Sequence, residues 1–403
     1  MRTFRTSPRP LPAVLQPDPS GMGARALRRA ASLGSLLAVF AAAGCSGDGT
    51  GPDEVSGLRD AAIVVNSLGG TLSFVGRERE DGPLVAVNDA VELGPGANAV
   101  TLAIGEESVV VPVGGTDSLL VFAPPSSGEI ARRCAAALPA GSSPNGVVIA
   151  PGGFGGGGSA AAGDAFVSLL LSGEVARVDL GTCQVEAIAV VGAAPADLEV
   201  VGDELVVVVS NLDLSGGGFP VPRLGEGFVA VLDPLTLAIR DTFGTGGFNP
   251  QFATVDREGD LLVVNSGDFG AGNGSLSVLD VEGGRRTAGP FPLGDFPADL
   301  AMGPDNRAYV TSFSEGLYVF DATANVVLRG AGAALAAPPR GEEVRGSSGV
   351  SVNEDGEVLS VFFNDGVTPG TAFLFDAQGA LVDSVGVGLG PFSARFVDEA
   401  RFD

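Results

Sequence analysis

The 403-residue sequence contains no histidine, no lysine and no tryptophan, so all 23 basic residues are arginines. Without histidine or lysine, the chain cannot form a Ser-His-Asp triad, a Cys-His pair, an imidazole metal site or a lysine Schiff base. The phosphate loop that depends on a lysine is excluded as well. The absences therefore remove several classes of enzyme and leave binding proteins and carboxylate chemistry.

The composition favours β-structure built from short strands. The sequence has 62 glycines and 27 prolines, and 45% of its residues are hydrophobic against 6% aromatic. This balance predicts many short strands joined by tight turns around a large core. The length suits a single all-β domain made of repeats.

The formal net charge is −25, and it is unevenly distributed. The first 45 residues hold six arginines and one acid, so the rest of the chain is still more acidic. An acidic field repels nucleic acid and anionic lipid surfaces, and it attracts cations. We therefore expect no nucleic-acid partner.

Residues 22–45 have the layout of a secretion signal. Three arginines precede an apolar run over 33–43 that is too short to span a bilayer, and small residues stand before Cys45. The segment resembles a bacterial lipoprotein signal with Ala42-Ala43-Gly44-Cys45 as its lipobox. The resemblance implies that Cys45 becomes a lipidated N-terminus that anchors the protein to a membrane. A plain secretory signal with an incidental cysteine is the alternative.

The signal divides the chain. Residues 1–45 are expected to be an N-terminal extension with the signal peptide, 46–58 a flexible acidic tether, and 59–403 the folded domain. Ser46 stands where lipoproteins retained at the inner membrane commonly carry Asp, so the resemblance implies an outer-membrane address in the cell envelope.

Two further cysteines, Cys134 and Cys183, lie ten to twelve residues before Pro144 and Pro195. They occupy similar places in neighbouring repeats of the chain. In an oxidising compartment they form either a disulfide or two buried free thiols.

The sequence repeats itself. "PADLEVV" at Pro195 is echoed by "PADLAMG" at Pro297. Each unit has an apolar strand ending in Asn or Ser, a second strand usually closed by Asp, a third strand, and a connection rich in Gly and Pro into a fourth. The first strands contain, in order, Ile63, Val109, Phe166, Leu205, Leu261, Ala308 and Val358. Seven four-stranded units with a spacing of about 40 to 57 residues predict a β-propeller.

The phrases "DNRAYVTS" and "NPQFATVDREGDLLVVNS" resemble the YVTN and NHL types of propeller repeat, over residues 60–397. In that family the strand after the proline lies innermost, around the central channel. The resemblance implies an all-β, seven-bladed β-propeller with four-stranded antiparallel blades. It also implies that the last strand, from Pro391, completes the first blade, which begins at Ala61, and so removes two exposed sheet edges.

The same register identifies candidate binding residues at one mouth of the channel. Asp197, Asp299 and Ser393 fall in equivalent places on the inner strands. Asn145, Gln251 and Ser348 fall at the alternate position along the strand. Long turns that begin at Asn211, Ser266 and Asn364 are expected on this face. The oxygens of Asp197, Asp299 and Asn145 could hold calcium, although Asp, Asn and Gly equally serve tight turns.

A second set of aspartates is expected to be structural. An aspartate closes the second strand of five units, where its side chain would cap the following turn. These residues are Asp179, Asp233, Asp280, Asp321 and Asp376.

Three functional hypotheses follow. The first is a membrane-anchored, non-enzymatic scaffold that binds a protein, a glycan or a cation in the envelope. The second is a calcium-dependent hydrolase resembling the gluconolactonase and lactonase propellers, which need a Glu, an Asn and an Asp on one metal; Glu199 would lie deeper on the same wall as Asp197. The third is a structural surface protein without a small ligand. Propeller lyases with a catalytic histidine are excluded.

Overall fold

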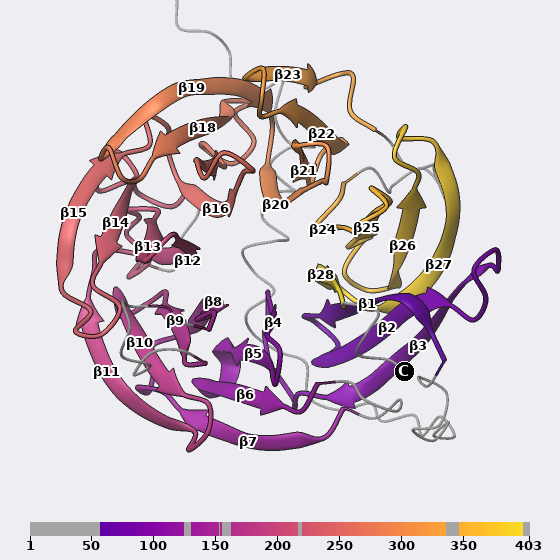
Figure 1. Cartoon of the computed structure of the whole chain (residues 1–403), viewed down its shortest axis with the longest axis horizontal. Helices are drawn as coiled ribbons and strands as arrows, with labels where there is room; N and C mark the ends of the chain where they lie inside the picture. The colour runs from indigo at the N-terminus through magenta and orange to yellow at the C-terminus, as the bar shows by residue number, and fades with distance from the viewer. Residues whose placement is uncertain are drawn as a thin grey trace, which may run out of the picture. The chain divides into compact units, whose positions relative to one another are not determined.

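The computed structural model describes residues 57–124, 130–152, 154, 163–216, 220–335 and 346–397. These residues form seven four-stranded antiparallel sheets, arranged as blades around a central channel (Figure 1). The predicted propeller is therefore confirmed, with seven blades. The predicted signal and Cys45 lie outside the described residues. Leu58, which we expected at the end of the tether, is instead buried in the core of the first blades.

The innermost strand of each blade lines the channel, and the second strand pairs with it. The innermost strands, from blade 1 to blade 7, are β28 (Pro391–Phe396), β4 (Ala103–Ile104), β8 (Pro144–Ile149), β12 (Pro195–Val201), β16 (Pro250–Val255), β20 (Pro297–Met302) and β24 (Gly349–Val352). The second strands are β1 (Arg59–Asn66), β5 (Val109–Val113), β9 (Ala165–Leu169), β13 (Glu204–Val209), β17 (Leu261–Asn265), β21 (Arg307–Ser312) and β25 (Val358–Phe362).

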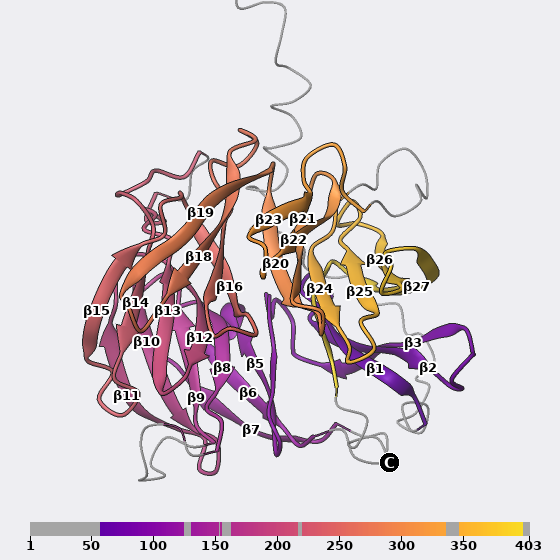
Figure 2. The same ribbon diagram turned by 45° about the horizontal axis from the view of Figure 1, so that its top comes forward.

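Two more strands complete each blade toward the outside, as the tilted view in Figure 2 shows. The third strands are β2 (Thr71–Arg77), β6 (Ser118–Phe122), β10 (Glu174–Asp179), β14 (Phe228–Leu232), β18 (Gly274–Asp280), β22 (Gly316–Asp321) and β26 (Pro369–Phe375). The outer strands are β3 (Leu84–Glu92), β7 (Arg132–Ala137), β11 (Gln184–Val190), β15 (Ile239–Gly244), β19 (Arg285–Gly294), β23 (Val326–Arg329) and β27 (Leu381–Leu389).

The hydrophobic patterns follow from the position of each strand in its blade. The second strands read as unbroken apolar runs, such as "LVVVV" in β13, because neighbouring blades cover both of their faces. All five of these residues are buried. The outer strand β11 instead alternates exposed and half-buried positions, because only one face packs on the blade beneath.

The ring is closed by the C-terminal strand, as predicted. β28 pairs antiparallel with β1, so that Ile63 lies opposite Arg395 and Val64 opposite Ala394. The chain end thereby provides the inner strand that blade 1 would otherwise lack. Closure pairs the inner edge of β1 with β28, whose own free edge faces the channel like that of the other innermost strands.

Two details differ from the sequence expectation or refine it. The inner strand of blade 2 was expected over "ANAVTLAI", but only Ala103–Ile104 pairs as a strand. The preceding segment remains largely buried without forming a ladder. Within the described residues the helical content is the single 3-10 turn η2 (Gly114–Thr116), and no helix could span a membrane.

The second strand of each sequence unit is the third strand of a blade, counted from the channel. The aspartates expected at its end cap the turns that follow, as predicted. Asp179 accepts hydrogen bonds from the backbone N–H groups of Gly181 and Thr182, and Asp233 from those of Leu235 and Thr236. Asp280, Asp321 and Asp376 do the same. These residues are part of the scaffold at the face opposite the prolines.

Candidate functional site

The repeated PADL motif builds a connection between neighbouring blades. Each proline opens an inner strand at a register shift, after which the strand pairs regularly. The Oδ2 atom of Asp197 then accepts the N–H of Ala253 on the next blade at 3.0 Å. Asp299 accepts the N–H of Val350 in the same way at 3.1 Å. The motif recurs because the blade 4–5 and blade 6–7 junctions use the same clamp.

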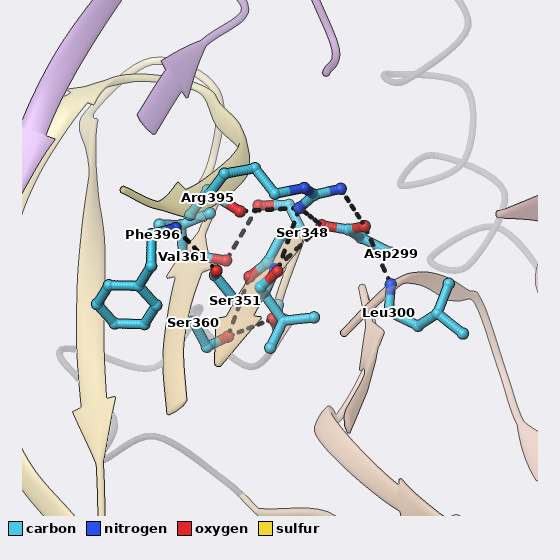
Figure 3. Close-up of polar contacts among 12 residues, drawn as sticks. Asp299, Leu300, Ser348, Ser351, Ser360, Val361, Arg395 and Phe396 are labelled. Carbon is cyan, nitrogen blue, oxygen red and sulfur yellow. Dashed lines mark hydrogen bonds and ion pairs between the residues drawn. The ribbon is translucent and has the colours of Figure 1, made fainter. Parts of the chain in front are cut away.

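Asp299 has a second partner, Arg395, that the sequence analysis missed. Arg395 on β28 reaches across to Asp299 on β20 (Figure 3), with Nη1 at 2.9 Å from Oδ2 and Nη2 donating to Oδ1 at 3.1 Å. Arg395 also donates to the carbonyl oxygens of Val350 and Ala394. The side chain of Asp299 is 4% exposed and that of Arg395 is 31% exposed. A buried carboxylate is therefore paired with a charge that water still reaches.

Asp197 and Glu199 lie two residues apart on β12, so alternation puts both on one face of the strand. Burial raises the pKa of Asp197 to about 6, against the hydrogen bonds it accepts and the charge of Arg395. The pKa of Glu199 is raised well above its usual range by burial and then by the charge of Asp197. The channel therefore holds two carboxyl groups whose pKa values are raised by burial.

The other predicted polar residues form hydrogen bonds to different partners. The Nδ2 group of Asn145 donates to the carbonyl oxygen of Ala196 on the next blade at 2.8 Å. Gln251 donates to the side-chain oxygen of Asn249, and Ser348 donates to the carbonyl oxygen of Pro391 at 2.7 Å.

Ser393 is the exception among the predicted residues. It is 2% exposed, and its Oγ has no hydrogen-bond partner among the described residues. The structure thus places the predicted residues on the inner strands, or directly before one in the case of Ser348, and distributes them over the ring. In the described part of the chain, no three His, Cys, Asp or Glu side chains gather closely enough to hold one metal ion. Calcium binding stays a prediction of the sequence.

The two remaining cysteines are joined. Cys134 on β7 and Cys183, just before β11, form a disulfide with a Cα–Cα distance of 6.5 Å. The bond connects the outer parts of blades 2 and 3. Of the two sequence alternatives, the structure contains the paired form.

We call the face at which the inner strands begin the proline face. It consists of the connections into the inner strands and the turns between second and third strands, for example 210–227, 266–273 and 363–368. The long turns that we predicted for one face all lie here. Exposed large apolar side chains gather on these loops, namely Leu171, Leu224, Phe248 and Val367. On the turns of the opposite face, the described residues include one such side chain, Leu235.

Phenylalanines add to this face. Phe269 stacks on Phe296 with ring centroids 5.5 Å apart, and Phe392 contacts both Phe313 and Phe363. All five rings are half-buried, so each leaves part of its surface to solvent. The composition of the loops could not show this clustering, because the rings come from blades 5, 6, 7 and 1.

Comparison with known proteins supports the fold. No family model and no curated protein sequence matches the chain. Among solved structures, hydrazine synthase from Kuenenia stuttgartiensis aligns with 13% identity and a TM-score of 0.55, over 76% of this chain and 94% of that one. A quinonprotein alcohol dehydrogenase-like protein from Bacteroides thetaiotaomicron aligns with 11% identity and a TM-score of 0.57, over 84% of this chain and 78% of that one. At such identities the similarity is one of propeller architecture.

Proposed function

We propose that the protein is a cell-envelope lipoprotein that acts as a non-enzymatic scaffold and binds a protein partner through its proline face. The lipidated Cys45 would hold the domain at the outer membrane, and the propeller would present its loops to the partner. The lipobox and the secretion signal support the anchor, and the loops of the proline face support the binding role.

The observation that carries the proposal is the asymmetry between the two faces. Val367 is 80% exposed at the tip of one proline-face loop, and Leu171, Leu224 and Phe248 are exposed on three others. On the turns of the opposite face the described residues include one, Leu235 at 39% exposure. The other exposed large apolar side chains lie on outer strands, with Ile239, Val326 and Leu381 at the strand ends nearest that face. Exposed apolar side chains collected on one face are typical of a protein interaction site. Three of these four proline-face side chains are aliphatic, which suits a protein surface better than a glycan.

The contacts of the inner strands also favour a scaffold. Asp299 is occupied by Arg395 and by the backbone of the next blade, and Asn145 by a backbone carbonyl. Side chains used in this way hold the blades together. A rigid ring that presents long loops is a common arrangement in binding proteins.

Crosslinking from both faces tests the binding role. A photo-crosslinking amino acid at position 367 is expected to capture a defined envelope protein in living cells, and the same amino acid at position 235 is the control. Equal capture from both positions, or none from either, would contradict a binding role for the proline face.

The anchor is tested separately. Cells fed an alkyne-labelled fatty acid are expected to label the wild-type protein but not the variant Cys45→Ser, and that variant should leave the membrane fraction. Labelling that persists in the variant would show that Cys45 is not the lipidated residue.

A further inference from the structure

The loops of the proline face carry charge of nearly one sign. Their described residues include one basic side chain, Arg223, and seven acidic ones: Asp117, Asp213, Glu226, Asp268, Asp295, Glu315 and Asp365. Among the described ion pairs, only Asp268 of this set is matched with an arginine. No arginine in the described part of the chain forms an ion pair with the other six.

Backbone N–H groups fix several of these carboxylates without neutralising them. Asp295 accepts hydrogen bonds from Gly270 and Gly272, and Asp365 from Val367 and Thr368. A carboxylate held in this way keeps its charge and has less side-chain freedom to lose when a cation binds.

Arg223 shows which cation such a surface accepts. Its guanidinium carbon lies 4.0 Å from the centre of the Phe248 ring, and its Nε is 3.2 Å from Oδ1 of Asp268. The three residues come from three different loops, so the arginine is seated between an aromatic face and a carboxylate at the junction of blades 4 and 5. A planar guanidinium suits this combination better than an ammonium group.

We propose that the proline face docks an arginine-bearing segment of its protein partner, whose guanidinium groups lie against phenylalanine rings and loop carboxylates as Arg223 does. This inference rests on the proposed binding function and specifies the chemistry of the partner. Phe296, Phe313 and Phe363 are half-buried and lie within two residues of Asp295, Glu315 and Asp365, so aromatic and acidic residues also occur close together in the sequence of other proline-face loops.

The first experiment measures binding of fluorescent peptides to the protein by anisotropy, at low and high ionic strength. The probes are three peptides of equal length in which glycine alternates with arginine, lysine or glutamate. We expect the arginine peptide to bind several-fold more tightly than the lysine peptide, the glutamate peptide not to bind, and high salt to weaken binding. Equal affinity for arginine and lysine peptides, or binding indifferent to salt, would overturn the proposal.

The second experiment removes Arg223 from its place between Phe248 and Asp268. The variant Arg223→Ala should bind the arginine peptide about three- to tenfold more tightly than wild type, because the peptide can take the vacated place. Arg285→Ala makes the same change of charge on the opposite face and should alter the affinity little. The double variant Arg223→Ala/Phe248→Ala should lose the gain. Equal increases in affinity in the two single variants would mean that only net charge matters, and would refute a specific guanidinium site at Phe248 and Asp268.

These results are separable from the proposed function. If position 367 crosslinks a partner but the arginine peptide fails to bind, the face is an interface and the inference about arginine is wrong. If neither occurs, both the function and the inference fail.

Discussion

The replacement Asp197→Asn tests whether the buried negative charge of Asp197 lowers the free energy of unfolding. The amide oxygen of asparagine can still accept the N–H of Ala253, so the clamp between blades 4 and 5 is kept. Only the negative charge is removed. We expect the variant to be more stable than wild type at neutral pH.

The magnitude follows from the pKa. The carboxyl of Asp197 titrates at about 6 in the folded protein against an ordinary value of 3.8, and each pKa unit corresponds to about 1.4 kcal/mol. The folded protein therefore binds more protons than the unfolded chain between about pH 4 and pH 6, and stability falls as pH rises through this window. Above the window the full cost is about 3 kcal/mol. Because the side chain is only half-buried, we expect the variant to gain about 1–3 kcal/mol at pH 7 and little at pH 4.

Urea unfolding of wild type and variant across pH 4 to 8 measures this difference. The matched control is Asp233→Asn, because hydrogen bonds from Thr236 and neighbouring groups lower the pKa of Asp233 to about 2. The contribution of that carboxylate is present above about pH 4 and is lost as pH falls toward 2, so its variant should lose stability at pH 7, by less than about 1 kcal/mol for a surface group. A stability difference for Asp197→Asn that does not change between pH 4 and pH 7 would refute the electrostatic account.

Three further predictions concern the ring. Arg395→Ala leaves the buried Asp299 without its ion-pair partner, and a loss of about 3–5 kcal/mol in the free energy of unfolding is expected at pH 7; the double variant with Asp299→Asn should recover part of it in the same urea titration. Replacing both disulfide cysteines by serine opens a loop with a sequence separation of 49 residues, which should cost about 2–4 kcal/mol, and an unchanged unfolding midpoint would contradict a stabilising disulfide. Removing residues 391–403 deprives blade 1 of β28, so we expect loss of the cooperative unfolding transition, measured by circular dichroism.

The sequence allowed the fold to be predicted because each blade repeats the same local rules. Apolar second strands recur in every unit, and aspartate-capped turns and prolines before the inner strands recur in five of the seven, so the number of blades followed from the pattern. The pairing of β28 with β1 followed from the resemblance to known propeller repeats. The inner strand of blade 2 was the exception. "ANAVTLAI" has the right composition, but only its last two residues form a ladder. The absence of an opening proline does not explain this, because β24 also lacks one and pairs over four residues.

The candidate site was less predictable, because the hydrogen-bond partners of a side chain depend on which segments lie next to it in the folded structure. The register placed Asp197 and Asp299 at the channel, but it could not reveal that each accepts an N–H group from the next blade, 51 or 56 positions away. Arg395 had a usable signal. It lies two residues after Ser393 on the same strand, so the alternation that linked Asp197 with Glu199 also placed Arg395 on the channel wall.

The clamps and the loops are connected by their places in the ring. The Asp197 clamp joins blades 4 and 5 and the Asp299 clamp joins blades 6 and 7, and the three long loops rise from blades 4, 5 and 7. A long loop contributes to binding only if its base is fixed, because any freedom of the base must be lost when a partner docks. Aspartates that hold adjacent inner strands in register supply this fixed base without occupying the loops. If the proline face binds a partner as proposed, a buried residue such as Asp299 supports recognition without touching that partner.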